Sequence, residues 1–115
     1  MADEYLGERD GVEQVSAAEL EERLARGDVV VLDVRPGAEY RAGHIPGARS
    51  VPLAELASLA PKLPRRRQIV AYFRGPYCVY ADDAVRLLQA RGLKARRLDV
   101  GLPEWRRAGL PVDTS

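Results

Sequence analysis

Two nearly unbroken apolar runs limit the possible folds of this chain more than any other feature. Residues Val29–Val34 read VVVLDV, and residues Gln68–Phe73 read QIVAYF. Strands that are buried on both faces have this pattern, which is typical of a parallel sheet covered by helices. The sequence therefore predicts a central sheet with helices on both of its faces.

Amphipathic segments alternate with these two strands. The first predicted helix begins with Ser16 as N-cap, with Glu19 completing a capping box, and it ends at Gly27. The alternation, without internal repeats, predicts an α/β domain with a mainly parallel sheet of four or five strands flanked by helices on both faces. Further helices are expected over residues 38–41, 53–61, 79–91 and 102–108, and further strands over 14–15, 49–51 and 95–100.

Length and composition indicate one domain. The chain has 115 residues, 46% of them hydrophobic and 30% charged, which is ordinary for a soluble globular domain. We expect residues 13–115 to form this domain, with residues 1–12 as a polar tail or linker. The formal net charge of +1 does not favour binding to nucleic acid or to a membrane surface.

The chain contains one cysteine, so it cannot form an intrachain disulfide, and no segment has the apolar character of a leader or a membrane span. A reducing, cytoplasmic setting is therefore expected. His44 is the only histidine, and no cysteine or acid lies at metal-ligand spacing from it. We expect no metal site and no cofactor.

The stretch from Gln68 to Gly92 is the first candidate for a functional site. It runs from a strand through the loop RGPYCV, residues 74–79, into an amphipathic helix. Backbone N–H groups and the helix dipole favour anions at such a junction. Cys78 is a candidate thiolate there, although a lone cysteine also serves as a small buried hydrophobic residue. Arg74 is the best candidate to attract an oxyanion.

Several motifs together resemble those of single-domain rhodaneses, the sulfurtransferase fold. LDVR at 32–35, Glu39-Tyr40, GHIPGA at 43–48 and Val51-Pro52 look like the first rhodanese signature. GLPEW at 101–105 and GLPV at 109–112 look like the C-terminal signature. The resemblance spans roughly residues 14–112. It implies transfer of sulfane sulfur from a thiosulfate-like donor, through a cysteine persulfide, to a thiophilic acceptor.

A narrower resemblance concerns the loop at 74–79 and the junction YLGERDG at 5–11. Both are similar to segments of rhodanese domains that follow an ArsR-type winged-helix module in two-domain regulators. The chain is then either one domain of a longer regulator or a free-standing relative. No winged-helix sequence is present, so DNA binding is not expected of this domain.

The resemblance also exposes a departure at the site. In the family, the nucleophilic cysteine directly follows the central strand, and alignment places Phe73 there. Cys78 falls on the last loop position, where many relatives carry arginine. Phenylalanine has no nucleophilic atom, so sulfur transfer through position 73 is chemically impossible.

Two interpretations remain, and the enzymatic status stays open. In the first, Cys78 replaces the missing carrier: the helix N-terminus and Arg74 favour its thiolate, whereas Asp82 and Asp83 oppose it. Alternatively, the domain is not catalytic, and its loop binds an oxyanion or thiol acceptor, senses thiol or sulfur state, or docks a protein partner. The loop residues concerned are Arg74, Gly75, Pro76, Tyr77, Cys78 and Val79.

Four other residues are expected to be structural. Asp33 and Arg35 flank the end of a buried strand, where charges persist only when they are paired. We expect Arg35 to pair with Glu39 or another nearby acid. His44 is expected to bond to backbone, and Trp105 to pack in the core or at a hinge.

The last predictions concern three tyrosines around the loop and one glycine. Tyr72, Tyr77 and Tyr80 are expected to gather around it, with Tyr77 or Tyr80 lining a substrate pocket. Gly43 is expected to serve backbone geometry.

Overall fold

The computed structural model of the protein describes residues 13–74 and 79–114. The predicted tail over residues 1–12 and the loop residues Gly75, Pro76, Tyr77 and Cys78 lie outside the described residues. The elements in chain order are β1 (Gln14–Val15), α2 (Ala17–Arg26), β2 (Val29–Asp33), α3 (Gly37–Ala42), β3 (Arg49–Ser50), α4 (Leu53–Leu59), the 3₁₀ turn η1 (Ala60–Lys62), β4 (Gln68–Tyr72), α5 (Val79–Ala90), β5 (Lys94–Leu98) and α6 (Leu102–Arg107).

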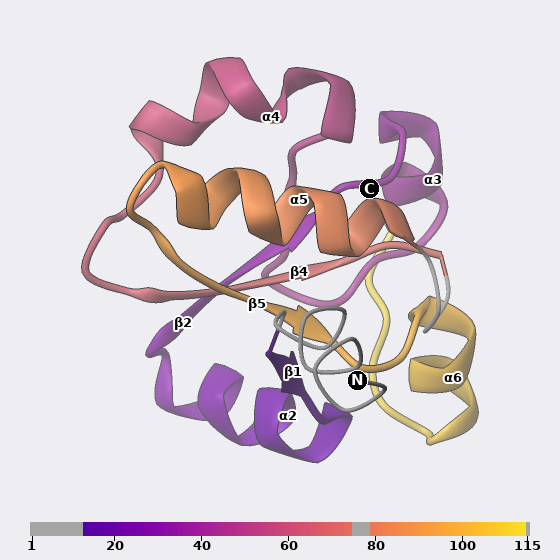
Figure 1. Ribbon diagram of the computed structural model, residues 1–115. Coiled ribbons are helices and arrows are strands. Elements are labelled where there is room, and N and C mark those ends of the chain that lie inside the picture. The colour runs from indigo at the N-terminus through magenta and orange to yellow at the C-terminus, as the bar shows by residue number, and fades with distance from the viewer. Residues whose placement is uncertain (1–12, 75–78, 115) are drawn as a thin grey trace, which may run out of the picture.

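The predicted α/β architecture is confirmed. In the described part of the chain, five strands form one sheet in the order β1-β5-β4-β2-β3, and every neighbouring pair is parallel. Helices α4 and α5 cover one face, and α2 and α6 cover the other (Figure 1). The two apolar runs form β2 and β4, which lie side by side inside the sheet.

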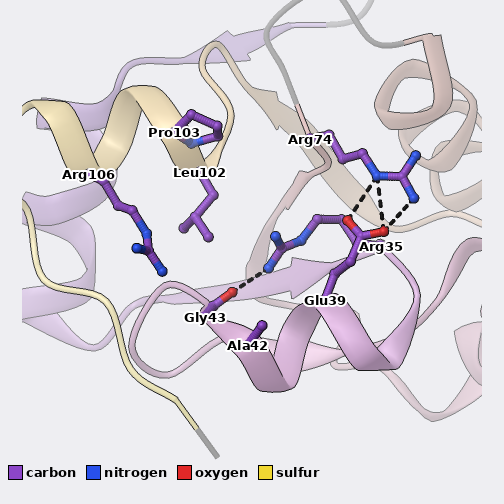
Figure 2. Close-up of a pocket in the computed structure, with 8 residues that line it drawn as sticks. All are labelled: Arg35, Glu39, Ala42, Gly43, Arg74, Leu102, Pro103 and Arg106. Atoms are coloured by element: carbon purple, nitrogen blue, oxygen red, sulfur yellow. Dashed lines mark hydrogen bonds and ion pairs between the residues drawn. The ribbon is translucent and has the colours of Figure 1, made fainter.

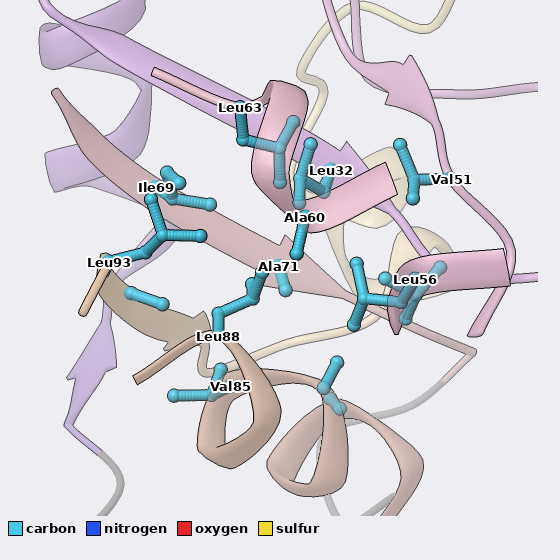
Figure 3. Close-up of a cluster of buried hydrophobic side chains, with 14 of the residues drawn as sticks. Leu32, Val51, Leu56, Ala60, Leu63, Ile69, Ala71, Val85, Leu88 and Leu93 are labelled. Atoms are coloured by element: carbon cyan, nitrogen blue, oxygen red, sulfur yellow. The ribbon is translucent and has the colours of Figure 1, made fainter. Parts of the chain in front are cut away.

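Alternate residues of the central strands supply two separate cores. Val30, Leu32, Ile69 and Ala71 pack toward α4 and α5, in the cluster shown in Figure 3. The intervening positions of both strands pack toward α2 and α6, where Trp105 is the largest buried side chain. Both faces of β2 and β4 are thus buried, which explains their continuous apolar sequence.

Helix α2 begins and ends largely as its sequence predicts. Ser16 Oγ accepts the backbone N–H of Glu19 at 3.1 Å, and Gly27 ends the helix with a left-handed φ of 72°. The second half of the predicted capping box is wrong. The Glu19 carboxylate accepts hydrogen bonds from Arg23 and Arg96 instead of reaching back to Ser16, because two guanidinium groups are within its reach.

Other element boundaries differ from prediction by a few residues. Strand β5 covers Lys94–Leu98 rather than residues 95–100, because β1 and β4 offer no ladder partner beyond Leu98. The helix expected to stop at Pro61 continues as the 3₁₀ turn Ala60–Lys62. Proline is tolerated there because the first residues of a helical turn have no intrahelical acceptor for their N–H groups.

The chain order creates a crevice between β2 and β4. The connection after β2 leads outward to β3, whereas the connection after β4 leads in the opposite direction to β5. In parallel sheets, ligands bind outside the carboxyl ends of the strands at such a point. Residues that follow Asp33 and Tyr72 therefore face the expected site.

No helix among the described residues is long and apolar enough to cross a membrane.

Candidate functional site

A cavity of about 460 Å³ lies at the carboxyl ends of β2 and β4. Figure 2 shows Arg106 on one side of it, facing Arg35, Arg74 and Glu39 on the other. We call it the arginine cavity, because three of its lining residues are arginines from separate parts of the chain. Its lining residues are Arg35, Glu39, Ala42, Gly43, Arg74, Leu102, Pro103 and Arg106.

Arg35 is fixed by a buried ion pair with Asp33. Its backbone N–H and its Nε donate to Asp33 Oδ1 at 3.0 and 2.9 Å, and its NH2 group donates to Oδ2 at 2.6 Å. The same NH2 group donates to the Gly43 carbonyl at 2.5 Å. The predicted pairing with a nearby acid is confirmed for Asp33, but pairing with Glu39 is wrong, since Glu39 binds Arg74.

Tyr72 completes the buried network below the cavity. It lies opposite Asp33 in the β2–β4 register, and its hydroxyl donates to Asp33 Oδ2 at 2.8 Å. The same hydroxyl accepts the Ile45 N–H at 3.1 Å. Burial and the neighbouring Asp33 charge raise the pKa of Tyr72 well above its ordinary value. Tyr72 is therefore a neutral donor under the cavity rather than part of its surface.

Arg74 lies at the start of the loop and pairs with Glu39 of α3. Its Nε donates to Glu39 Oε1 at 2.8 Å and to Oε2 at 3.1 Å, and its NH2 group also contacts Oε2. The guanidinium carbon lies 4.9 Å from the centroid of the Phe73 ring, a cation–π distance. Hydrogen bonding to Arg74 lowers the pKa of Glu39, so this carboxylate is charged at neutral pH.

The Arg106 guanidinium lies close against Gly43, which has no side chain. A Cβ atom at Gly43 would collide with the Arg106 NH2 group. Gly43 has an extended φ of 167°, which any residue adopts, so the expected role in backbone geometry is wrong. Within the described residues, no hydrogen bond or ion pair involves the Arg106 guanidinium, in contrast to Arg35 and Arg74.

A second cavity, of about 440 Å³, lies on the α4 and α5 side of the β4 end. Phe73 contributes to its wall and is only 6% exposed. The Phe73 ring packs against Tyr80, with centroids 5.2 Å apart, and Tyr80 is half-exposed. Tyr80 thus lines this apolar cavity, not the arginine cavity. The complete lining is Val34, Pro36, Pro52, Leu53, Ala54, Phe73, Arg74 and Tyr80.

His44 and Trp105 have structural contacts. His44 Nδ1 lies 2.8 Å from the Tyr40 carbonyl, as expected for a backbone-bonded histidine, and its ring stacks on Tyr40 at 3.7 Å. Trp105 is buried, and its Nε1 donates to the Pro111 carbonyl at 2.7 Å. Both residues hold the C-terminal segment and the α3 loop against the sheet.

Most of the loop at residues 74–79 lies outside the part of the chain that the structure describes. Gly75, Pro76, Tyr77, Cys78 and the side chain of Val79 lie outside the described residues. Asp82, which was expected to oppose a Cys78 thiolate, has its Oδ1 2.9 Å from Arg97 Nε. The described residues contain no group of three His, Cys, Asp or Glu side chains able to hold a metal ion.

Sequence reasoning missed Arg106 and the wall of α6 around it. Arg106 lies between the two C-terminal motifs and belongs to neither, so no sequence motif marks it as a site residue. Its place in the cavity depends on how α6 packs against the rest of the domain, where its guanidinium lies next to Gly43.

The family model for the rhodanese-like domain matches residues 16–108, most of the chain. The chain belongs to the rhodanese-like family. This rhodanese-like domain has sulfurtransferases among its relatives. It is 31% identical over 102 residues to a sulfurtransferase of Allochromatium vinosum, covering 88% of the chain and 94% of that protein.

A crystal structure of thiosulfate sulfurtransferase from Pseudomonas aeruginosa superimposes with a TM-score of 0.77 at 29% identity, covering 96% of this chain and 22% of that one. The HTH-type transcriptional regulator Rv0324 of Mycobacterium tuberculosis is 54% identical over 99 residues, or 86% of the chain. The chain spans 44% of the length of that regulator. The predicted resemblance to rhodanese domains of transcriptional regulators agrees with this match.

Proposed function

We propose that this rhodanese-like domain binds a small sulfur oxyanion of the thiosulfate class in the arginine cavity, without carrying sulfur at position 73. One observation carries the proposal: guanidinium groups that follow β2, follow β4 and project from α6 line a single cavity. Guanidinium groups match the geometry of oxyanions and remain charged at all physiological pH values.

The binding surface is partly preorganised. Arg35 is held by Asp33 and by the Gly43 carbonyl, so little side-chain entropy is lost when an anion binds beside it. Arg106 brings a charge that no described acid neutralises. The names of two relatives, a sulfurtransferase and a thiosulfate sulfurtransferase, favour a sulfur oxyanion over other anions.

Position 73 argues for binding without sulfur transfer at that position. By the resemblance to the family, Phe73 stands at the nucleophile position, and its ring packs against both Arg74 and Tyr80. We infer that the anion is recognised as a signal. A sensory role suits a chain with a transcriptional regulator among its relatives.

The test compares two neighbouring arginines of α6. Thiosulfate is titrated at constant ionic strength against chloride, and affinity is taken from calorimetry or from the rise in melting temperature. Arg106→Gln is expected to weaken thiosulfate binding about tenfold, as for the loss of one charge-assisted hydrogen bond. Arg107→Gln, with the same charge change outside the cavity lining, should bind like the parent chain.

Two results would contradict the proposal. One is a parent chain whose stability responds to thiosulfate no more than to chloride. The other is an equal loss of affinity in both variants, which would indicate general attraction to a basic surface rather than a site.

A second candidate function is sulfur transfer through Cys78. Helix α5 begins at Val79, the next residue, and a helix N-terminus stabilises a thiolate. The thiolate would attack the sulfane sulfur of thiosulfate, forming a cysteine persulfide and releasing sulfite. This candidate predicts a mass gain of one sulfur atom after incubation with thiosulfate, lost in Cys78→Ser. Intact mass spectrometry that finds no adduct with any sulfane donor would reject it.

A further inference from the structure

Glu39 is the single acid among the described residues that line the arginine cavity. It projects from the first turn of α3, and both of its carboxylate oxygens accept hydrogen bonds from Arg74. The Nε and NH2 groups that it occupies form the edge of a guanidinium that binds carboxylate, sulfate or phosphate oxygens in pairs. Glu39 therefore stands where an incoming oxyanion would bind Arg74.

The two ion pairs at the cavity differ in how readily they can open. The side chains of Arg35 and Asp33 are 7% and 0% exposed, so separating them would leave a charge buried without a partner. The side chains of Arg74 and Glu39 are 55% and 34% exposed. Water can solvate the Glu39 carboxylate once it leaves Arg74, and exposed ion pairs contribute little to stability.

Building on the proposed anion site, we propose that Glu39 is its specificity-determining residue: an internal carboxylate that competes with the ligand for Arg74 and disfavours binding in proportion to the ligand's negative charge. A dianion experiences twice the repulsion that a monoanion experiences at the same distance. Only a ligand that binds Arg74 better than Glu39 does can use all three arginines. The low pKa of Glu39 keeps this competitor charged at neutral pH.

The chemistry of the ligand follows from the three guanidinium groups. A monoanion such as acetate offers one carboxylate, which repeats the interaction that Arg74 already makes with Glu39. Thiosulfate is a tetrahedral dianion with several acceptor atoms in different directions, so it can accept from more than one guanidinium group. The preference for small tetrahedral dianions therefore comes from the three arginines, and Glu39 lowers the affinity of the cavity for them.

The experiment titrates thiosulfate and acetate at constant ionic strength into the parent chain, Glu39→Gln and Glu22→Gln, with affinity measured by calorimetry. Glu39→Gln is expected to raise thiosulfate affinity about tenfold and acetate affinity about threefold, since the electrostatic effect scales with ligand charge. Glu22→Gln is the matched control, because Glu22 also pairs with an arginine, Arg26, on an exposed helix surface. It should leave both affinities unchanged.

Glu39→Ala is a second variant for the same titration. The Gln amide oxygen in Glu39→Gln can still accept a hydrogen bond from Arg74, whereas the alanine side chain cannot. An increase in thiosulfate affinity in both Glu39 variants supports the inference. Unchanged or weaker thiosulfate binding in both, with binding by the parent chain intact, overturns the inference and leaves the proposed function standing. No thiosulfate binding by the parent chain or by either variant refutes the inference and the proposed function together.

Discussion

At the scale of single residues, Asp33 organises the site more than any arginine does. Its carboxylate is fully buried and accepts from Arg35 and from the Tyr72 hydroxyl. Such a buried charge is tolerable only because charged and neutral donors surround it. The arrangement fixes one cationic wall of the arginine cavity and at the same time joins β2 to β4 by their side chains.

Tyr72→Phe tests this network without changing side-chain volume much. The change removes the donor to Asp33 and leaves the buried Ile45 N–H without its acceptor. We expect a loss of about 1–3 kcal/mol in the free energy of unfolding, measured by urea denaturation. Tyr80→Phe is the control, because Tyr80 is half-exposed and should change stability by less than about 0.5 kcal/mol. Equal stabilities of the two variants would contradict the prediction.

At the scale of elements, the last residue of strand β4 and the two residues after it face different environments. Tyr72 packs on the α2 and α6 side, and Phe73 packs on the α4 and α5 side. Arg74 then turns into the arginine cavity and also borders the apolar one. Period-two alternation of the strand thus places position 73 under helix α5, next to the loop that follows.

Phe73→Cys asks whether the remaining site supports sulfur transfer once a nucleophile is present. We expect thiosulfate:cyanide sulfur transfer to appear in this variant, because the cysteine would lie beside Arg74 at the β4 end. The smaller side chain should reduce stability by roughly 2–4 kcal/mol, because Phe73 belongs to the core facing α5.

Thiocyanate production is the measurement, and Phe73→Ser is the control that has the smaller side chain without the thiol. If Phe73→Cys folds but produces no more thiocyanate than Phe73→Ser, the expectation of a competent site around position 73 is wrong.

At the scale of the whole molecule, the sheet order assembles the site from distant parts of the chain. Connections leave β2 and β4 in opposite directions, so the segments after both strands border one crevice. Helix α6 closes that crevice from the other side and contributes Arg106, as Figure 2 shows. The proposed anion site is therefore a property of the complete domain rather than of the loop alone.

Much of this architecture was predictable because it depends on local patterns. Continuous apolar runs are typical of strands buried on both faces of a parallel sheet, and the cap residues Ser16 and Gly27 fixed the ends of α2. The strand ends and the 3₁₀ turn were less predictable. They depend on where neighbouring strands stop offering hydrogen-bond partners, which no local pattern contains.

The sequence by itself determined the family, the parallel sheet and the absence of a nucleophile at position 73, because each depends on residue type or short-range spacing. The tertiary structure decided which charges meet. Arg35 is held by Asp33, Glu39 turns to Arg74, and Arg106 fits against Gly43. Side-chain pairing depends on distances across the fold, and Arg74 lies 35 residues from Glu39 in the chain yet within hydrogen-bonding distance of it.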